Sequence, residues 1–188
     1  MREPGRVRAW GLWAGWCRHL ALALMMLPLA ALAQGSPPFT AATWNLRLDT
    51  ASDGPNAWPH RRDAVRALIR WHGFDLFGTQ EALAHQVDDL EAMTEFGRVG
   101  VGRDDGARGG EYAAIFYRRS RFALQAEGTF WLSPTPDRPS MGWDARCCKR
   151  IASWARLQDR ATGRSFVVFS AHFDHEGVVA RRESARLL

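Results

Sequence analysis

Three short polar segments, each directly after an apolar run typical of a β-strand, constrain the fold of this chain most. They are Thr43-Trp44-Asn45-Leu46-Arg47, Gly78-Thr79-Gln80-Glu81 and Ser170-Ala171-His172-Phe173-Asp174-His175. Polar side chains delivered to strand ends gather at one edge of a sheet. The pattern therefore predicts a site with an amide, a carboxylate and an imidazole, the groups that metal-assisted cleavage of a phosphoester requires.

The N-terminal segment is typical of a secretory leader. Four arginines precede an apolar run from Leu20 to Leu32, and Ala31-Leu32-Ala33 has the small-x-small pattern of a cleavage site. The run is shorter than the roughly 20 residues that span a bilayer, which disfavours an uncut membrane anchor. We expect residues 1–33 to be removed on export, leaving a periplasmic or secreted protein with no stable membrane span.

The residues after the leader suffice for one domain, which we place at 38–188. Four arginines and one glutamate belong to the leader, so the formal net charge falls from +5 for the whole chain to +2 for the rest. A basic footprint this weak does not indicate a nucleic-acid-binding protein. Nucleic acid is therefore expected only as a substrate.

Two adjacent cysteines, Cys147 and Cys148, remain after the leader. A disulfide between neighbours closes a strained small ring, so we expect no stable bridge between them. A bridge to another molecule, or a partner outside the present sequence, are the alternatives.

Apolar runs and helical periodicity alternate along the rest of the chain. Strands are expected at 39–46, 74–79, 97–101, 112–117, 122–132, 153–158 and 165–170, with a tight hairpin at Thr162-Gly163. Helices are expected from Pro59 to Trp71 and around Val87, Leu90 and Met93. The first helix is predicted to bury Ala64, Val65, Leu68, Ile69 and His72 and to turn Arg61, Arg62, Arg66 and Arg70 to solvent.

The run Phe166-Val167-Val168-Phe169 is apolar without alternation, so we expect its strand to be covered on both faces. Two sheets with helices outside them would achieve this, which predicts an α/β fold. The glycines from Gly100 to Gly110 lack the ending of a nucleotide-binding loop and are interpreted as a flexible loop before Glu111.

Each candidate side chain also has a more ordinary interpretation. Glu81 offers a hard oxygen ligand for Mg²⁺, although a glutamate at a strand end is commonly just solvated. Asn45 could hold a phosphate oxygen or orient a metal-bound water, or simply start a turn. His172 is expected to contact a phosphate oxygen or act as acid or base, with a structural hydrogen bond as the alternative. Zn²⁺ binding by His172, Asp174 and His175 is disfavoured because strand alternation points His175 away.

Taken in order, these segments resemble the endonuclease/exonuclease/phosphatase superfamily of metal-dependent phosphoesterases. The resemblance runs from about Phe39 to the last residue. It is carried by Thr43-Trp44-Asn45-Leu46-Arg47, Thr79-Gln80-Glu81, Gly102-Arg103-Asp104-Asp105-Gly106, Gly110-Glu111-Tyr112, Ile115-Phe116-Tyr117-Arg118, Gly128-Thr129-Phe130-Trp131-Leu132-Ser133 and Ala171-His172-Phe173-Asp174-His175.

The resemblance implies a four-layered α/β sandwich of two mainly antiparallel sheets flanked by helices. It implies that Glu81 ligates Mg²⁺ or Mn²⁺, that Asn45 helps to bind the metal-held phosphate, and that His172 contacts or protonates the phosphate. Arg150 and Asp174 are implied as supporting residues, with Arg150 touching substrate.

The sequence also departs from the family pattern. Members carry a Gly-Asp-x-Asn segment in their second half and a Ser-Asp-His segment near the C-terminus, and neither occurs before Leu188. We therefore expect a fragment of an exported phosphoesterase that is monomeric at full length, truncated at its C-terminus and nearly inactive as written. A non-catalytic remnant or binding module of the same fold is the alternative, and no residue here dictates which phosphoester is cleaved.

Overall fold

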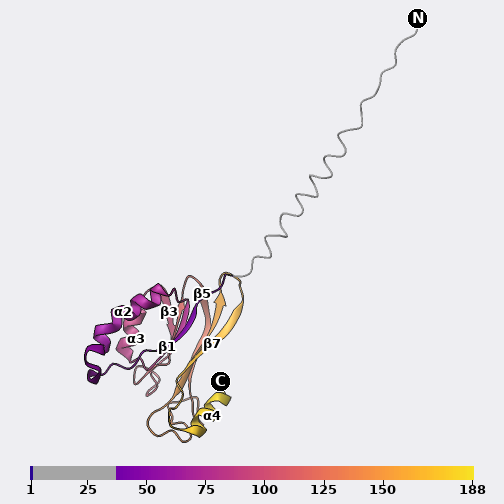
Figure 1. The fold of residues 1–188 in the computed structure, drawn as a ribbon. Coiled ribbons are helices and arrows are strands. Elements are labelled where there is room, and N and C mark those ends of the chain that lie inside the picture. The colour runs from indigo at the N-terminus through magenta and orange to yellow at the C-terminus, as the bar shows by residue number, and fades with distance from the viewer. Residues whose placement is uncertain (2–36) are drawn as a thin grey trace. The chain divides into compact units, whose positions relative to one another are not determined.

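The computed structural model describes Met1 and residues 37–188, so the predicted leader lies, except for Met1, outside the described residues. The fold of residues 38–188 consists of two β-sheets with helices beside them (Figure 1).

The first sheet has four strands in the order β1-β2-β4-β3. They are β1 (Ala41–Asn45), β2 (Leu76–Gln80), β4 (Ile115–Arg118) and β3 (Phe96–Val99). β1 and β2 run parallel, whereas β4 is antiparallel to both of its neighbours. A parallel pair needs a long crossover. Here the crossover contains the 3₁₀ helix η2 (Ala51–Asn56) and the helix α2 (Trp58–Trp71).

The second sheet contains three antiparallel strands in the order β5-β6-β7. They are β5 (Phe122–Trp131), β6 (Ile151–Asp159) and β7 (Ser165–Ala171). The turn between β6 and β7 contains Gly163 with φ 71°, a conformation that favours glycine. The predicted hairpin at Thr162-Gly163 is confirmed.

The helices α2 and α3 (Ala84–Glu91) cover one face of the first sheet (Figure 1). Their apolar side chains pack with aromatic side chains of the sheet into one cluster, which includes Trp58, Val65, Ile69, Val87, Leu90, Phe77, Phe96 and Phe116. The rings of Phe77 and Phe116 stack with their centroids 4.9 Å apart. Burial of this apolar surface against the sheet is what holds the helices in place.

The sequence predicts a wider apolar side for α2 than the structure has. Val65 and Ile69 are buried as expected, but Leu68 is 42% exposed, and Ala64 and His72 are also exposed. The helix meets the sheet only along the narrow stripe that begins at Trp58, so the residues beside that stripe remain in solvent.

A second apolar cluster fills the space between the two sheets. It contains Leu76, Val99, Ile115 and Tyr117 from the first sheet and Phe122, Ala155 and Leu157 from the second. At one end the Ser170 hydroxyl of β7 donates to the Thr79 carbonyl of β2 over 3.3 Å. This contact brings the end of β2, which precedes Glu81, next to the end of β7, which precedes His172. The predicted α/β sandwich is confirmed, with helix, sheet and sheet layers formed by the described residues.

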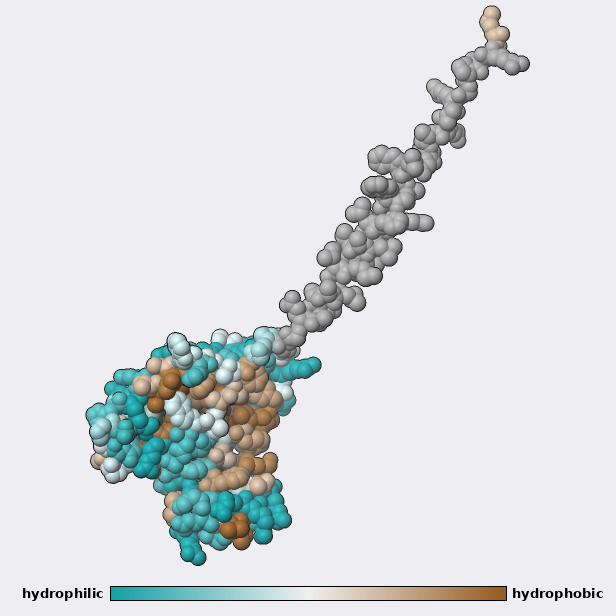
Figure 2. All heavy atoms as spheres, viewed as in Figure 1, coloured by the Kyte–Doolittle hydropathy of each residue, from teal (hydrophilic) through white to brown (hydrophobic). Residues whose placement is uncertain are grey.

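The outer face of β7 is not covered, which corrects the expectation for the Phe166–Phe169 run. Val167 is 50% exposed and Phe169 is 46% exposed. Only the alternate residues Phe166 and Val168 pack toward the first sheet. Figure 2 shows apolar side chains gathered over the part of the molecule where β7 lies in Figure 1. The helix α4 (Val178–Leu187) lies beyond the end of the sheets and leaves this face open.

Cys147 and Cys148 are joined by a disulfide, which corrects the expectation that these neighbours stay unbridged. In a strand, adjacent side chains would point to opposite faces. The loop between β5 and β6 has neither strand nor helix at these two positions, so no regular backbone holds the sulfur atoms apart.

Across the part of the chain that the structure describes, none of the helices combines the length and apolarity that crossing a bilayer requires.

Candidate active site

The parallel pairing of β1 and β2 brings Asn45 and Glu81 together. Asn45 is paired with Gln80 across the two strands, and Glu81 is the next residue. The Asn45 amide nitrogen donates to Glu81 Oε1 over 2.7 Å. The Asn45 side-chain oxygen Oδ1 accepts a hydrogen bond from the Arg47 backbone amide over 2.9 Å. Asn45 therefore orients the carboxylate of Glu81 and fixes the turn after β1 at the same time.

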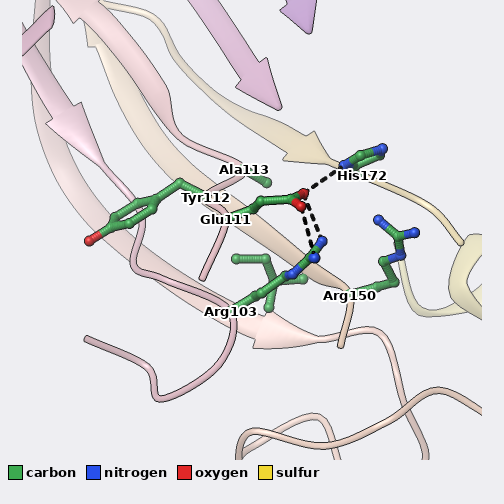
Figure 3. Close-up of a pocket in the computed structure, with 7 residues that line it drawn as sticks. Arg103, Glu111, Tyr112, Ala113, Arg150 and His172 are labelled. Atoms are coloured by element: carbon green, nitrogen blue, oxygen red, sulfur yellow. Dashed lines mark hydrogen bonds and ion pairs between the residues drawn. The ribbon is translucent and has the colours of Figure 1, made fainter. Parts of the chain in front are cut away.

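Glu111 enters the site from the loop before β4, a position that the sequence interpretation did not assign to the site. Its carboxylate accepts two hydrogen bonds from the Arg103 guanidinium, at 2.8 and 2.9 Å (Figure 3). Burial raises the pKa of Glu111 above its ordinary value, with the charge of Glu81 adding to this and that of Arg103 opposing it. The carboxylates of Glu81 and Glu111 therefore lie close enough for their charges to interact.

His172 follows the last residue of β7. Its Nδ1 lies 3.8 Å from Glu111 Oε2 and is buried without a hydrogen-bond partner in the described structure. Burial lowers the pKa of His172, and the nearby Arg150 charge lowers it further, while Glu81 acts in the opposite sense. These surroundings therefore favour the neutral form of the imidazole.

Arg150 and Asp174 form a buried ion pair beside the imidazole. Arg150, just before β6, is 5% exposed, and its Nε lies 3.4 Å from Asp174 Oδ2. Burial opposes ionisation of Asp174, but the amides of Gly177 and Glu176 and the Arg150 guanidinium together hold the pKa of this carboxyl below its usual value. The buried arginine is thus kept in place by a carboxylate whose ionised form is favoured by its hydrogen bonds.

These side chains line a pocket. The lining residues are Arg103, Glu111, Tyr112, Ala113, Arg150, Ile151 and His172. Figure 3 shows Arg103 and His172 pointing toward Glu111, while the Tyr112 ring is turned away from them. Because Arg103 is already paired with Glu111, Arg150 and the His172 imidazole are the groups around this space that are suited to an anion such as phosphate.

The donor set at Glu81 is suited to Mg²⁺ or Mn²⁺. These hard cations take oxygen ligands, commonly one or two protein carboxylates, and leave the other positions to water and substrate. Glu81 Oε1 is engaged by Asn45, while Oε2 has only a 3.4 Å contact from the Leu48 amide. Oε2 is therefore the less engaged oxygen of the Glu81 carboxylate and the one better placed to take a metal, and Asn45 lies beside the same carboxylate.

The comparison with protein families matches residues 42–168 to the endonuclease/exonuclease/phosphatase family. The chain belongs to this family. Its members are hydrolytic phosphoesterases that depend on divalent metals. The matched range includes Asn45, Glu81, Glu111 and Arg150, whereas His172 and Asp174 lie beyond it. The comparison with curated protein sequences found no match.

Two solved structures from Bacteroides are similar to the chain. The endonuclease/exonuclease/phosphatase from Bacteroides vulgatus is 47% identical, covers 77% of this chain and 56% of its own, and has a TM-score of 0.75. A mannosyl-6-phosphatase from Bacteroides thetaiotaomicron is 45% identical, covers 80% of this chain and 57% of its own, and has a TM-score of 0.76. The present chain thus spans little more than half the length of these two relatives.

A more distant structure shows the fold alone. The D. rerio TDP2 complex with a single-strand DNA product is 16% identical, covers 77% of this chain and 50% of its own, and has a TM-score of 0.58. The predicted resemblance to the endonuclease/exonuclease/phosphatase superfamily is confirmed.

Proposed function

We propose that this chain belongs to an exported, divalent-metal-dependent hydrolase of small phosphoesters. The observation that carries the proposal is the convergence of Glu111, His172 and Arg150 on one pocket, electrostatically coupled to the Asn45–Glu81 pair. The N-terminal leader pattern supports export to the periplasm or beyond the cell.

Glu81, oriented by Asn45, would hold Mg²⁺ or Mn²⁺. When bound, this cation neutralises negative charge that develops on the phosphoryl oxygens. Arg150 lines the pocket and contributes a positive charge for the substrate phosphate. Because Asp174 holds the guanidinium in place, that charge is positioned before substrate arrives.

His172 is proposed to exchange a proton with the phosphoester. Its Nδ1 edge faces Glu111, which leaves Nε2 on the opposite side of the ring for a phosphate oxygen or an attacking water. The lowered pKa of His172 keeps Nε2 able to accept a proton at neutral pH. Glu111 then stabilises the imidazolium that this transfer creates.

The substrate is proposed to be a small phosphomonoester or phosphodiester, with a hexose phosphate as the first candidate. Similarity to a mannosyl-6-phosphatase at 45% identity supports this choice. The near-neutral charge of the chain after the leader supports a small molecule over a long nucleic acid.

We also propose that the 188-residue chain is a fragment of a longer phosphoesterase, monomeric at full length. The open outer face of β7 and the share of the Bacteroides relatives that the chain spans support this. The second candidate is a non-catalytic remnant or binding module of the same fold. A true stop codon, with no Gly-Asp-x-Asn or Ser-Asp-His segment in the downstream reading frame, would favour it.

The test compares the 188-residue chain with a version extended through the downstream reading frame. Both are assayed against hexose phosphates, phosphodiesters and inositol phosphates with Mg²⁺, Mn²⁺ or EDTA. We expect the extended protein to be active with metal and inactive in EDTA. Glu81→Gln and His172→Ala should each lower its kcat/KM by about 10² or more, whereas Glu127→Gln, an exposed carboxylate on β5, should leave it unchanged.

Turnover that persists in EDTA, or full activity in Glu81→Gln, would contradict the metal-dependent mechanism. An extended protein that folds but cleaves none of these compounds would favour the non-catalytic remnant.

A further inference from the structure

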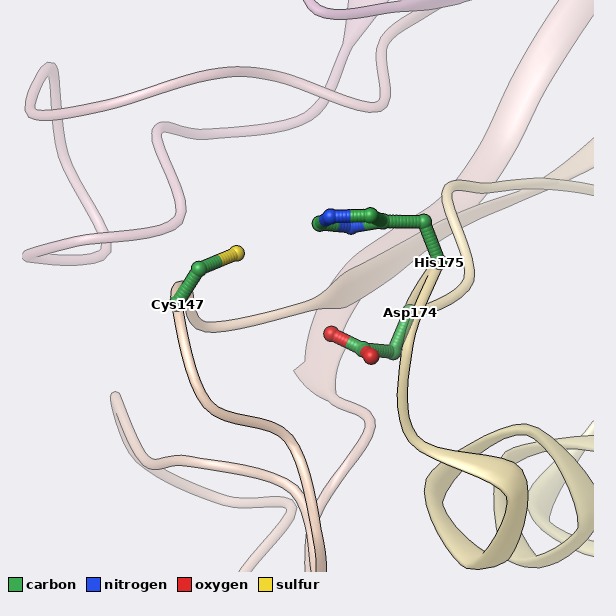
Figure 4. Close-up of side chains that lie close together, drawn as sticks. All are labelled: Cys147, Asp174 and His175. Atoms are coloured by element: carbon green, nitrogen blue, oxygen red, sulfur yellow. The ribbon is translucent and has the colours of Figure 1, made fainter.

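Beside the phosphate pocket, the loop before β6 and the segment after β7 bring three different metal-ligating side chains together. One ligand atom each from Cys147, Asp174 and His175 lies within 4.8 Å of the other two. Figure 4 shows the three side chains pointing into the same space. Within the described residues, this is the one group of three or more histidine, cysteine and carboxylate side chains that close.

All three atoms are already in contact with a cation, the guanidinium of Arg150. Arg150 Nη2 lies 2.8 Å from His175 Nδ1 and 3.9 Å from Cys147 Sγ. Arg150 Nε lies 3.4 Å from Asp174 Oδ2. The cluster is therefore arranged to surround a positive charge, which the protein supplies from within.

The charge of the cluster depends on the disulfide. With Cys147 bonded to Cys148, Sγ is neutral, so Asp174 carries the only negative charge and one guanidinium balances it. A dithiol reductant would donate two electrons and two protons, break the S–S bond, leave two thiols and become a disulfide itself. Loss of the Cys147 thiol proton on metal binding then creates a second negative charge, and two negative charges suit a divalent cation.

We propose that reduction of the Cys147–Cys148 disulfide converts this cluster into a binding site for a thiolate-preferring divalent cation such as Zn²⁺, which displaces the guanidinium of Arg150. Cys147, Asp174 and His175 supply the three protein ligands, and water takes the fourth position.

The surroundings of the three ligands allow this exchange. Ligand atoms around a tetrahedral Zn²⁺ are about 3.5 Å apart, so the present atoms must close by roughly 1 Å. Cys147 and His175 are exposed side chains on irregular segments, whereas Asp174 is buried and anchored by the amides of Glu176 and Gly177 at 2.9 and 2.6 Å. Two exposed ligands can therefore close on one anchored carboxylate.

Displacement of Arg150 would remove a positive charge from the phosphate pocket. Loss of phosphoesterase activity in the reduced, Zn²⁺-loaded protein is expected for this reason, and this consequence alone rests on the proposed function. The metal site itself does not depend on the chain being an enzyme.

The test uses Co²⁺ as a spectroscopic substitute for Zn²⁺ in the full 188-residue chain. The protein is reduced, freed of reductant without air, and titrated with Co²⁺. We expect one equivalent of Co²⁺ to bind with a thiolate-to-metal charge-transfer absorption that Zn²⁺ abolishes. The oxidised chain should show no such absorption.

Two matched variants separate this site from unspecific binding by a free thiol. Cys148→Ser frees Cys147 and should bind Co²⁺ with the thiolate absorption even without reductant. Cys147→Ser also lacks the disulfide, but it should not show the absorption. His175→Ala in the Cys148→Ser protein should weaken Zn²⁺ binding at least about tenfold, the effect that loss of even an outer-shell partner of a metal ligand produces.

The proposal is wrong if the reduced chain and Cys148→Ser both lack the thiolate absorption, or if Cys147→Ser shows it equally. Because this measurement does not use turnover, an extended protein that binds Co²⁺ as described but cleaves no phosphoester would refute only the proposed function. An active enzyme without the absorption would refute only the metal site.

Discussion

At the scale of single residues, Arg47 and Glu81 share a backbone conformation that L-residues seldom adopt. Their φ angles are 60° and 65°, and each residue lies just past the end of a parallel strand. This left-handed region costs an ordinary residue about 1–2 kcal/mol. The Arg47 carbonyl is held there by donors from Arg61 at 2.9 Å and Gln86 at 3.0 Å. The turns that carry the carboxylate are therefore preorganised by their surroundings.

Substitution of Asn45 would test whether the turn that carries Glu81 is preorganised. Asn45→Ala removes both the 2.7 Å bond to Glu81 and the acceptor of the Arg47 amide. Because Asn45 orients the proposed metal ligand, we expect the Mn²⁺ concentration for half-maximal activity of the extended enzyme to rise about tenfold, with a smaller change in the maximal rate. Asn56→Ala, at an exposed position in η2, is the control. An unchanged Mn²⁺ requirement would show that Asn45 does not position Glu81.

At the scale of secondary-structure elements, an ion pair closes the end of the β5–β6 pair. Arg121 donates from Nε and Nη2 to the two oxygens of Asp159, each over 2.9 Å. The Ala161 amide donates to the same carboxylate over 2.9 Å. The hydrogen bond from Arg121 is the main cause that lowers the pKa of Asp159. This carboxylate therefore links the start of β5 with the turn after β6.

The lowered pKa of Asp159 makes a prediction about stability in acid. The unfolded chain, with an ordinary aspartate pKa of about 4, binds the proton at a higher pH than the folded chain does. The stabilisation that ionised Asp159 gives the fold is thus fully present above the pKa of the unfolded chain. It is lost as the pH falls through the lower pKa of the folded chain. Asp159→Asn should lower stability at pH 7 and flatten its decline in acid, measured as the urea midpoint at a series of pH values. Asp63→Asn, whose carboxylate is 81% exposed, should keep the wild-type slope. Parallel slopes for Asp159→Asn and wild type would contradict the assignment.

Shortening a side chain to alanine should destabilise the protein more on the inner face of the second sheet than on its outer face. Leu157 is fully buried between the sheets, whereas Val167 is 50% exposed on the outer face of β7. Leu157→Ala should cost about 2–5 kcal/mol in free energy of unfolding, and Val167→Ala less than about 1 kcal/mol. Urea denaturation of both variants measures this. Equal losses would mean that the outer face of β7 is covered in solution.

The sequence predicts elements well where a local pattern carries the information. β1 and β2 are recognisable in the sequence because each is an apolar run that ends at a polar residue. The run at β7 is apolar throughout, so no local pattern indicates that Val167 and Phe169 lack a covering layer. That depends on what packs there, and neighbouring residues do not encode it.

The site was predictable in part for the same reason. Asn45, Glu81 and His172 directly follow or end strands, and the apolar runs of the sequence predict where those strands lie. Glu111 lies in an irregular loop, and only its pairing with Arg103 across that loop reveals its place in the pocket. The disulfide likewise depends on a backbone conformation in the β5–β6 loop that no propensity of Cys147 or Cys148 indicates.

At the scale of the whole molecule, the leader makes a prediction about the mature protein. If the chain is exported and cut after Ala33, expression in a secreting host should yield a polypeptide that begins at Gln34. Intact-mass analysis of the exported fraction measures this. Replacing Ala33 by Arg should leave the leader attached, because the cleavage site requires a small residue there. Exported protein that retains residues 1–33 without this change would contradict the prediction.

The bond from Ser170 to Thr79 joins positions 91 residues apart, and the bond from Asn45 to Glu81 joins positions 36 apart. Chains dominated by such distant pairings fold slowly, in roughly milliseconds to seconds. The reason is that large loops must close, at a cost in entropy, before the stabilising contacts can form. The candidate site depends on both bonds, so it is complete only after these loops have closed. If the chain is exported as proposed, slow folding keeps it for longer in the unfolded state in which a polypeptide can pass through a narrow translocation channel.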